Sequence, residues 1–153
     1  MAPFATDRGF LRRPLESKGP AATLMESPVV QFYTEPFFEE LARRLNEDAD
    51  WARWGKALDA GIVCTAIDLK RSFLLDIKKG KVSAREATPE TPAKYKFEGK
   101  YETWVALCKG ESELQKLIMA GKIRFTGPMP ELMGLAGPLN RIVMVARSFP
   151  KTF

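Results

Sequence analysis

The sequence of 153 residues contains no histidine. This absence excludes Ser-His and Cys-His nucleophile pairs, the commonest metal ligand and the commonest general base near neutral pH. Only two cysteines occur, Cys64 and Cys108, and two thiols without histidine cannot build the usual structural zinc site. A glycine-rich phosphate loop, a nucleophile elbow and a dinucleotide fingerprint are also lacking. We therefore expect no metal ion, no cofactor and no catalytic residue.

Long apolar runs are missing as well. No stretch of about 18 apolar residues exists, so the sequence predicts no transmembrane helix. The first residues lack the charged head and apolar region of a secretory signal. Cys64 and Cys108 lie inside apolar segments, and buried thiols suit a reducing compartment better than a disulfide framework does. We therefore expect a cytoplasmic protein.

The length and composition suit one globular domain, with 45% hydrophobic and 28% charged residues. Proline and glycine interrupt the first thirty residues too often for a regular element. We therefore predict an extended or disordered N-terminal arm over residues 1–30 and a folded domain over residues 31–153.

The domain begins with two helical patterns. Thr34 and Pro36 mark a helix start, and the apolar stripe that follows consists of Phe37, Phe38, Leu41 and Leu45. A second helix is predicted over residues 50–60, with Trp51 and Trp54 in the core. After these helices, apolar and polar residues alternate with a period of two. This alternation predicts five strands: residues 62–69, 73–78, 81–85, 94–98 and 122–126.

Two more helices lie between the last two strands. One runs from Tyr101 to Lys109, and the next begins at Ser112 with a capping box. A last helix is predicted over residues 139–148. These patterns predict an α+β fold with a five-stranded, mainly antiparallel sheet whose apolar face is covered by helices.

Alternation sorts the strand residues onto two faces. The apolar face contains Ile67, Phe73, Leu75, Ile77, Tyr95, Phe97, Ile123 and Phe125. The other face contains Lys78, Lys94, Lys96, Lys122 and Arg124. A packed core explains the apolar face fully. The basic face is either simply solvated or makes transient contact with an anionic membrane surface. Nucleic acid is disfavoured because the aromatic residues lie opposite the basic ones.

Methionines gather near the end of the chain. Met119, Met129, Met133 and Met144, four of the six, lie within or just beyond residues 114–139. Methionine is flexible and polarizable, so it suits surfaces that accommodate variable apolar partners. This segment is therefore either part of the core or a wall around something apolar.

The order of four segments resembles one known family. These are residues 33–47, the hairpin Phe73-Leu74-Leu75-Asp76-Ile77-Lys78-Lys79-Gly80-Lys81-Val82, residues 97–104, and Leu117-Ile118-Met119-Ala120-Gly121-Lys122-Ile123-Arg124-Phe125-Thr126-Gly127. Together they resemble the sterol carrier protein type 2 family of lipid-binding domains over residues 31–146. The N-terminal arm lies outside the family pattern and could cap or occupy a binding tunnel.

The resemblance implies an apolar tunnel between sheet and helices that carries a fatty acid, fatty acyl-CoA, sterol or similar lipid without covalent chemistry. The segment 129–139 would form a lid. The predicted tunnel contacts are Phe73, Leu75, Ile77, Trp104, Leu117, Ile118, Phe125, Met129, Leu132, Met133, Leu135 and Leu139.

Two other functions stay open. In an interaction or regulatory module, residues 129–139 would dock a partner and form an exposed apolar patch. An enzyme would need a carboxylate or lysine facing the tunnel, for which Asp68 and Asp76 are the candidates; both are otherwise outward-facing strand residues.

Overall fold

The computed structural model describes residues 29–153. The predicted arm lies outside this part of the chain, apart from residues 29 and 30. The elements in order are β1 (Val30–Gln31), α1 (Glu35–Glu47), α2 (Ala49–Gly55), β2 (Ala60–Ala66), β3 (Arg71–Lys78), β4 (Lys81–Ala87), β5 (Tyr95–Gly99), α3 (Tyr101–Lys109), α4 (Leu114–Met119), β6 (Ile123–Thr126), α5 (Met129–Gly134), α6 (Ala136–Arg147) and β7 (Lys151–Thr152).

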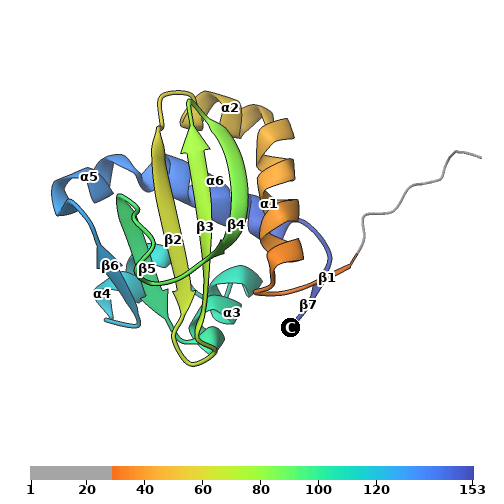
Figure 1. Cartoon of the computed structure of the whole chain (residues 1–153), viewed down its shortest axis with the longest axis vertical. Helices are drawn as coiled ribbons and strands as arrows, with labels where there is room; N and C mark the ends of the chain where they lie inside the picture. Colours follow the sequence, from red (N-terminus) through yellow and green to blue (C-terminus); the bar gives the residue numbers. More distant parts are fainter. Residues whose placement is uncertain (1–28) are drawn as a thin grey trace, which may run out of the picture.

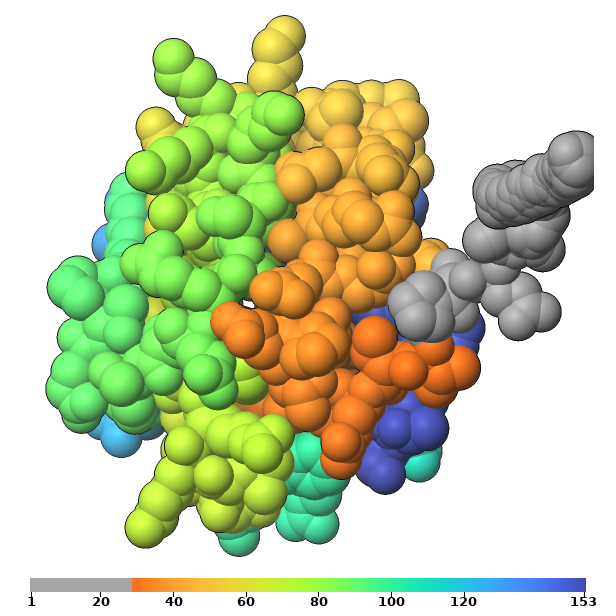
Figure 2. Space-filling view, turned by 45° about the vertical axis from the view of Figure 1, so that its right-hand side comes forward, coloured from red at the N-terminus to blue at the C-terminus, as the bar shows by residue number. Residues whose placement is uncertain are grey.

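Five strands form one sheet in the order β4-β3-β2-β5-β6, which confirms the predicted α+β fold. The β2–β5 pair is parallel and the other three pairs are antiparallel. Helix α6 runs behind the sheet, and α1 lies along its β4 edge (Figure 1). In the space-filling view the surface of α1 directly adjoins that of β4 (Figure 2). The helical layer therefore covers one face, as the alternation predicts.

Several elements agree with the local sequence signals that predicted them. The stripe of α1 is buried, and α3 ends at Gly110, whose φ of 82° suits a glycine at a helix end. The β3–β4 hairpin turns at Lys79 and Gly80 with φ values of 51° and 83°. Two positive φ values define the turn type that matches strand twist.

Other boundaries differ from the prediction. Helix α2 ends at Gly55, before the predicted residue 60, because Ala60 pairs with Ile77 and begins β2. Trp54 is 51% exposed, so its predicted place in the core is wrong.

The predicted start of α1 is confirmed, with Thr34 directly before the helix, but the predicted side-chain capping of α1 and α4 is wrong. The Thr34 hydroxyl donates to the carbonyl of Gln31, at 2.6 Å, and does not cap α1. Glu113, not Ser112, precedes α4, and no side chain caps that helix. Helix α6 begins at Ala136, three residues earlier than predicted.

The strand faces agree with the alternation except in β2. Ile62, Cys64 and Ala66 face the helices, so the neighbouring residues of β2 point to the opposite side. Ile67 follows the end of β2 and is 49% exposed, so its placement on the apolar face is wrong. The strand ends there because its pairing with β3 and β5 stops at Ala66.

Part of the basic face is paired within the molecule. The Lys94 ammonium lies 2.9 Å from the Glu131 carboxylate, and that of Lys96 donates to the carbonyl of Pro89 at 2.7 Å. Contact of this face with an anionic membrane stays a prediction. Among the helices of residues 29–153, none has the length and apolar character needed to cross a membrane.

Asn46 joins α1 to the edge strand β4. Its side chain donates to the carbonyl of Val82 and accepts from the Val82 N–H, both at 2.8 Å. We expect Asn46→Ala to lower the free energy of unfolding by about 1–3 kcal/mol, because both Val82 groups lose their partner. Urea unfolding followed by circular dichroism measures this. A change under about 0.5 kcal/mol would show that water replaces both hydrogen bonds.

Candidate ligand cavity

An apolar cavity of about 80 Å³ lies between the helical layer and the sheet. Its walls come from helices α1, α3 and α6, strands β2 and β3, and the segment between β1 and α1. The lining residues are Phe32, Tyr33, Phe37, Phe38, Leu41, Cys64, Leu75, Trp104, Leu107, Cys108, Ile142, Val143 and Ala146. None of these side chains carries a charge at neutral pH.

The apolar stripe of α1 forms one wall. Phe37, Phe38 and Leu41 are neighbours on one side of the helix because residues three and four apart share a face. The ring of Phe38 stacks on Phe73 of β3, with centroids 4.5 Å apart. This stacking fixes the helix against the sheet beside the cavity.

Helix α3 forms a second wall and is anchored to both layers. The Trp104 indole N–H donates to the carbonyl of Thr65 in β2, at 2.9 Å. Arg147 of α6 donates to the carbonyl of Leu107 at 3.0 Å and to that of Ser112 at 3.1 Å. These hydrogen bonds satisfy carbonyls at and just beyond the end of α3 and hold α3 and α6 side by side.

Both cysteines line the cavity as free thiols. Burial raises the pKa of Cys64 to about 12. Burial also raises the pKa of Cys108, whose thiol donates to the carbonyl of Ala146. Because the thiolate is the reactive form, both side chains are poor nucleophiles at neutral pH.

Tyr33 is the unusual residue of the wall. Its φ is 61°, a left-handed value that is uncommon for a bulky residue and costs about 1–3 kcal/mol. The side chain is 1% exposed, and its hydroxyl has no hydrogen-bond partner within residues 29–153. Burial raises the pKa of this hydroxyl well above its usual value, and the Cys64 thiol adds to the rise. The hydroxyl is therefore protonated and able to donate.

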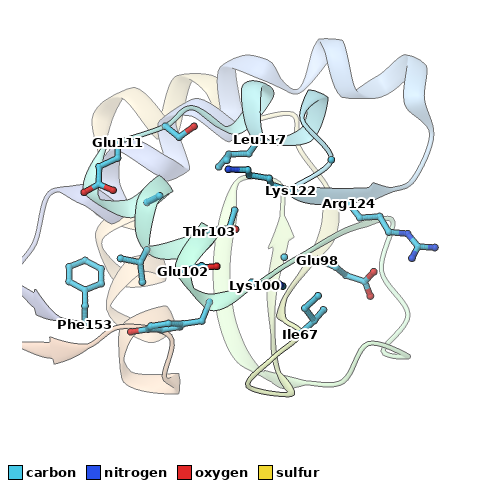
Figure 3. A pocket seen from close by; sticks show the side chains of 16 residues that line it. Ile67, Glu98, Lys100, Glu102, Thr103, Glu111, Leu117, Lys122, Arg124 and Phe153 are labelled. Carbon is cyan, nitrogen blue, oxygen red and sulfur yellow. The ribbon is translucent and has the colours of Figure 1, made fainter.

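A second, larger hollow lies at the surface on the other side of α3 (Figure 3). It has a volume of about 1260 Å³ and is lined partly by Glu98, Lys100, Glu102 and Arg124. Glu98 and Arg124 lie opposite each other on β5 and β6. Charged side chains of both signs stand in this groove beside apolar ones such as Val105 and Leu117, so it is less suited to a wholly apolar ligand than the uncharged cavity.

The structure brings few of the predicted contacts together. Leu75 and Trp104 line the apolar cavity, and Leu117 lines the surface groove. The other nine lie elsewhere: Phe73, Ile77, Leu135 and Leu139 are buried in the core, Ile118, Phe125 and Leu132 are partly buried against it, and Met129 and Met133 are exposed.

The segment 129–139 does not cover this cavity. Met129 and Met133 are 59% and 84% exposed, and α5 has no buried residue. Helix α5 follows β6 at one edge of the sheet, whereas the cavity lies under α1, α3 and α6 (Figure 1). The predicted lid is therefore not over the cavity, and a ligand contact by either methionine stays a prediction.

Sequence reasoning missed most of the wall, although signals for it were present. The apolar residues of α1, α3 and α6 were predicted only as helix faces, apart from Trp104, and they also form the core. Tyr33 stood out only as part of a family segment. Nothing in the spacing indicates which apolar side chains leave space between them.

The two carboxylates proposed for an enzyme do not face the cavity. Asp68 accepts a hydrogen bond from the backbone N–H of Tyr101 at the start of α3, at 2.8 Å. Asp76 lies on β3 next to the inward-facing Leu75 and Ile77 and therefore points to the opposite face.

Comparison with solved structures gives the same fold. The chain resembles a crystal structure of sterol carrier protein 2, with a TM-score of 0.70, 21% identity, and coverage of 78% of this chain and 99% of that one. It also resembles a possible sterol carrier protein from Thermus thermophilus, with a TM-score of 0.71 and 21% identity. That match covers 83% of this chain and 95% of the other. The sec-alkylsulfatase of a Pseudomonas species matches with a TM-score of 0.55 and 20% identity. That match covers 75% of this chain but only 16% of the enzyme.

The comparison with curated proteins gives no match. The family model of the SCP-2 sterol transfer family matches residues 38–140. This region contains the whole five-stranded sheet and most of the helical layer over it. The chain therefore belongs to the SCP-2 sterol transfer family.

Proposed function

We propose that this protein binds and carries a lipid or similar apolar molecule in the cavity between α1, α3, α6 and the sheet. The observation that supports this most directly is the uncharged wall of the cavity, which lies between the two layers of a fold shared with sterol carrier proteins. An apolar ligand there gains about 0.8 kcal/mol for each methylene group removed from water.

The cavity has to widen for such a ligand. Its volume of about 80 Å³ is below the roughly 300–1,000 Å³ of typical ligand pockets. Ten methylene groups contribute about 8 kcal/mol on leaving water, enough to displace several side-chain contacts. A membrane offers a lipid the same gain, so a carrier needs only to match it.

The part of α6 between its two polar anchors is the wall segment best suited to move. Arg141 pairs with Asp48, with a shortest distance of 2.6 Å, and Arg147 is held by carbonyls of and beyond α3. Hydrogen bonding to Arg141 lowers the pKa of Asp48, so this pair persists at neutral pH. Between these polar anchors Ile142 and Val143 contact the cavity through apolar surface alone. Sliding apolar contacts leaves no hydrogen bond unpaired.

We propose carriage without covalent chemistry, in the cytoplasm. The protonated thiols of Cys64 and Cys108 and the structural hydrogen bond of Asp68 support a purely binding role. Delivery to an anionic membrane through the remaining basic residues, such as Lys122 and Arg124, is compatible with the net charge of +5.

Two measurements test this function. Native mass spectrometry of the purified protein is expected to show one bound lipid, because ten or more buried methylene groups give slow dissociation. A fluorescent fatty acid is expected to bind and to be displaced by unlabelled lipid. Absence of both co-purified lipid and displaceable probe would reject the proposal.

The exposure of Met129 and Met133 favours a second candidate, a module that docks a protein partner through α5. The same displacement measurement separates the two. A module that works only through α5 has no need of a ligand cavity and would leave the fluorescent fatty acid unbound.

A further inference from the structure

Tyr33 combines three features that a purely structural residue rarely shows together. Its backbone has a positive φ, its side chain is 1% exposed, and its hydroxyl has no partner within residues 29–153. The strained backbone and the unpaired buried hydroxyl are each unfavourable for the folded protein. Such local costs concentrate at sites where a group is held ready for a ligand.

The surrounding structure fixes the ring in this unfavourable position. Arg71 donates to the backbone carbonyl of Tyr33 at 3.2 Å. The ring lies edge-on to Phe38 and Phe73, with centroids 5.2 Å and 5.6 Å away, and tilted to Trp104 at 5.8 Å. Contacts on several sides leave the hydroxyl little freedom to find another partner.

Other polar groups of the wall are weaker or already engaged. The Trp104 N–H is bound to Thr65, and the Cys108 thiol is bound to Ala146. The Cys64 thiol is a weak hydrogen-bonding group. Tyr33 belongs to the cavity wall, and its hydroxyl is a strong donor that is itself buried and without a partner within the described chain, so a ligand reaches it when the cavity widens.

We propose that the Tyr33 hydroxyl binds the single uncharged oxygen of an amphiphilic lipid, and thereby selects an alcohol or other neutral head over a carboxylate. This inference rests on the proposed function, because it assumes that a ligand enters the cavity. The ligand is then a molecule with a long apolar chain or ring system and one hydroxyl or carbonyl oxygen at its buried end.

The preference for a neutral head follows from the charges around the cavity. Its lining includes no arginine or lysine. The cations next to its wall, Arg147 and Lys151 near Cys108, donate to backbone carbonyls, so a buried carboxylate would have to compete for them. Arg71 is the basic residue bound at Tyr33, and its guanidinium donates to the backbone carbonyl. An unpaired carboxylate in an apolar site is far more costly than a hydroxyl that accepts one hydrogen bond.

The test measures displacement of a fluorescent probe by dodecan-1-ol, dodecane and dodecanoate at neutral pH. The wild type is expected to bind dodecan-1-ol about five- to tenfold more tightly than the other two. Tyr33→Phe is expected to lose this preference while its affinity for dodecane stays unchanged. Urea unfolding is expected to show Tyr33→Phe at least as stable as the wild type, because the unpaired hydroxyl is gone.

Tyr95→Phe is the matched control. Tyr95 is also buried, but its hydroxyl donates to Glu131 at 2.7 Å, and it does not line the cavity. This variant is expected to keep the wild-type order of ligands.

The outcomes separate the two proposals. Equal binding of alcohol and alkane by the wild type, an unchanged preference in Tyr33→Phe, or tighter binding of dodecanoate would overturn the role of Tyr33 and leave the carrier function standing. Failure of the wild type to bind any of the three would overturn the carrier function itself.

Discussion

The Ala146→Leu variant is expected to bind an apolar ligand about thirtyfold more weakly than the wild type while staying folded. Ala146 lies on α6 and lines the cavity of about 80 Å³. Leucine adds three carbons, which occupy space that a ligand would otherwise fill. Excluding two or three methylene groups at about 0.8 kcal/mol each removes about 2 kcal/mol of binding free energy.

The fold is expected to tolerate this change. Leucine has nearly the helix propensity of alanine, and its side chain enters existing space. We therefore expect a free energy of unfolding equal to that of the wild type or about 1 kcal/mol higher. A loss of binding that accompanies a gain in stability cannot be attributed to unfolding.

Ala52→Leu supplies the control for this variant. Ala52 is an exposed residue of α2, so the same substitution there adds the same carbons outside the cavity. Affinity is measured for both variants by displacement of the fluorescent probe, and stability by urea unfolding. Equal affinity of Ala146→Leu and Ala52→Leu would place the ligand somewhere other than this cavity.

Elements with strong local signals were predictable from the sequence. Helix α3 has the predicted bounds because its apolar positions recur at helical spacing and Gly110 ends it. The β3–β4 hairpin follows from alternation on either side of Lys79 and Gly80. These signals depend on a few neighbouring residues, so they predict the element without knowledge of its tertiary contacts.

Elements that depend on distant partners were not predictable. The short strands β1 and β7 pair with each other from opposite ends of the domain, and two residues carry no alternation to detect. The parallel β2–β5 pairing depends on how the sheet is assembled, which no local pattern encodes. Trp54 has helical spacing with Trp51, but packing of α2 leaves it half exposed.

The candidate site was also only partly predictable from the sequence. Apolar spacing identified the layers that enclose the cavity, and Leu75 and Trp104 were predicted as contacts. Where space remains between close-packed layers depends on the volumes of many side chains at once. The unpaired hydroxyl of Tyr33 likewise becomes visible only when every neighbour has a position.

Trp51→Ala is expected to lower the free energy of unfolding by about 3–5 kcal/mol, the largest stability effect that we predict. Trp51 is 1% exposed and packs against Gly55, where an added Cβ would lie 2.6 Å from the ring. Its indole N–H donates to the carbonyl of Gly80 at 2.7 Å. The substitution therefore leaves a large cavity and an unpaired carbonyl in the hairpin turn.

Helix α2 also supports α6, one wall of the cavity, through hydrogen bonds that the substitution keeps. The backbone N–H of Trp51 donates to Asp48, and the same carboxylate binds Arg141 of α6. Trp54→Ala is the comparison in the same helix, since Trp54 is half exposed, and we expect a cost of about 1–2 kcal/mol there. Far-UV circular dichroism in urea measures both variants without relying on tryptophan fluorescence. If Trp51→Ala costs no more than Trp54→Ala, Trp51 does not join α2 to the hairpin as the geometry indicates.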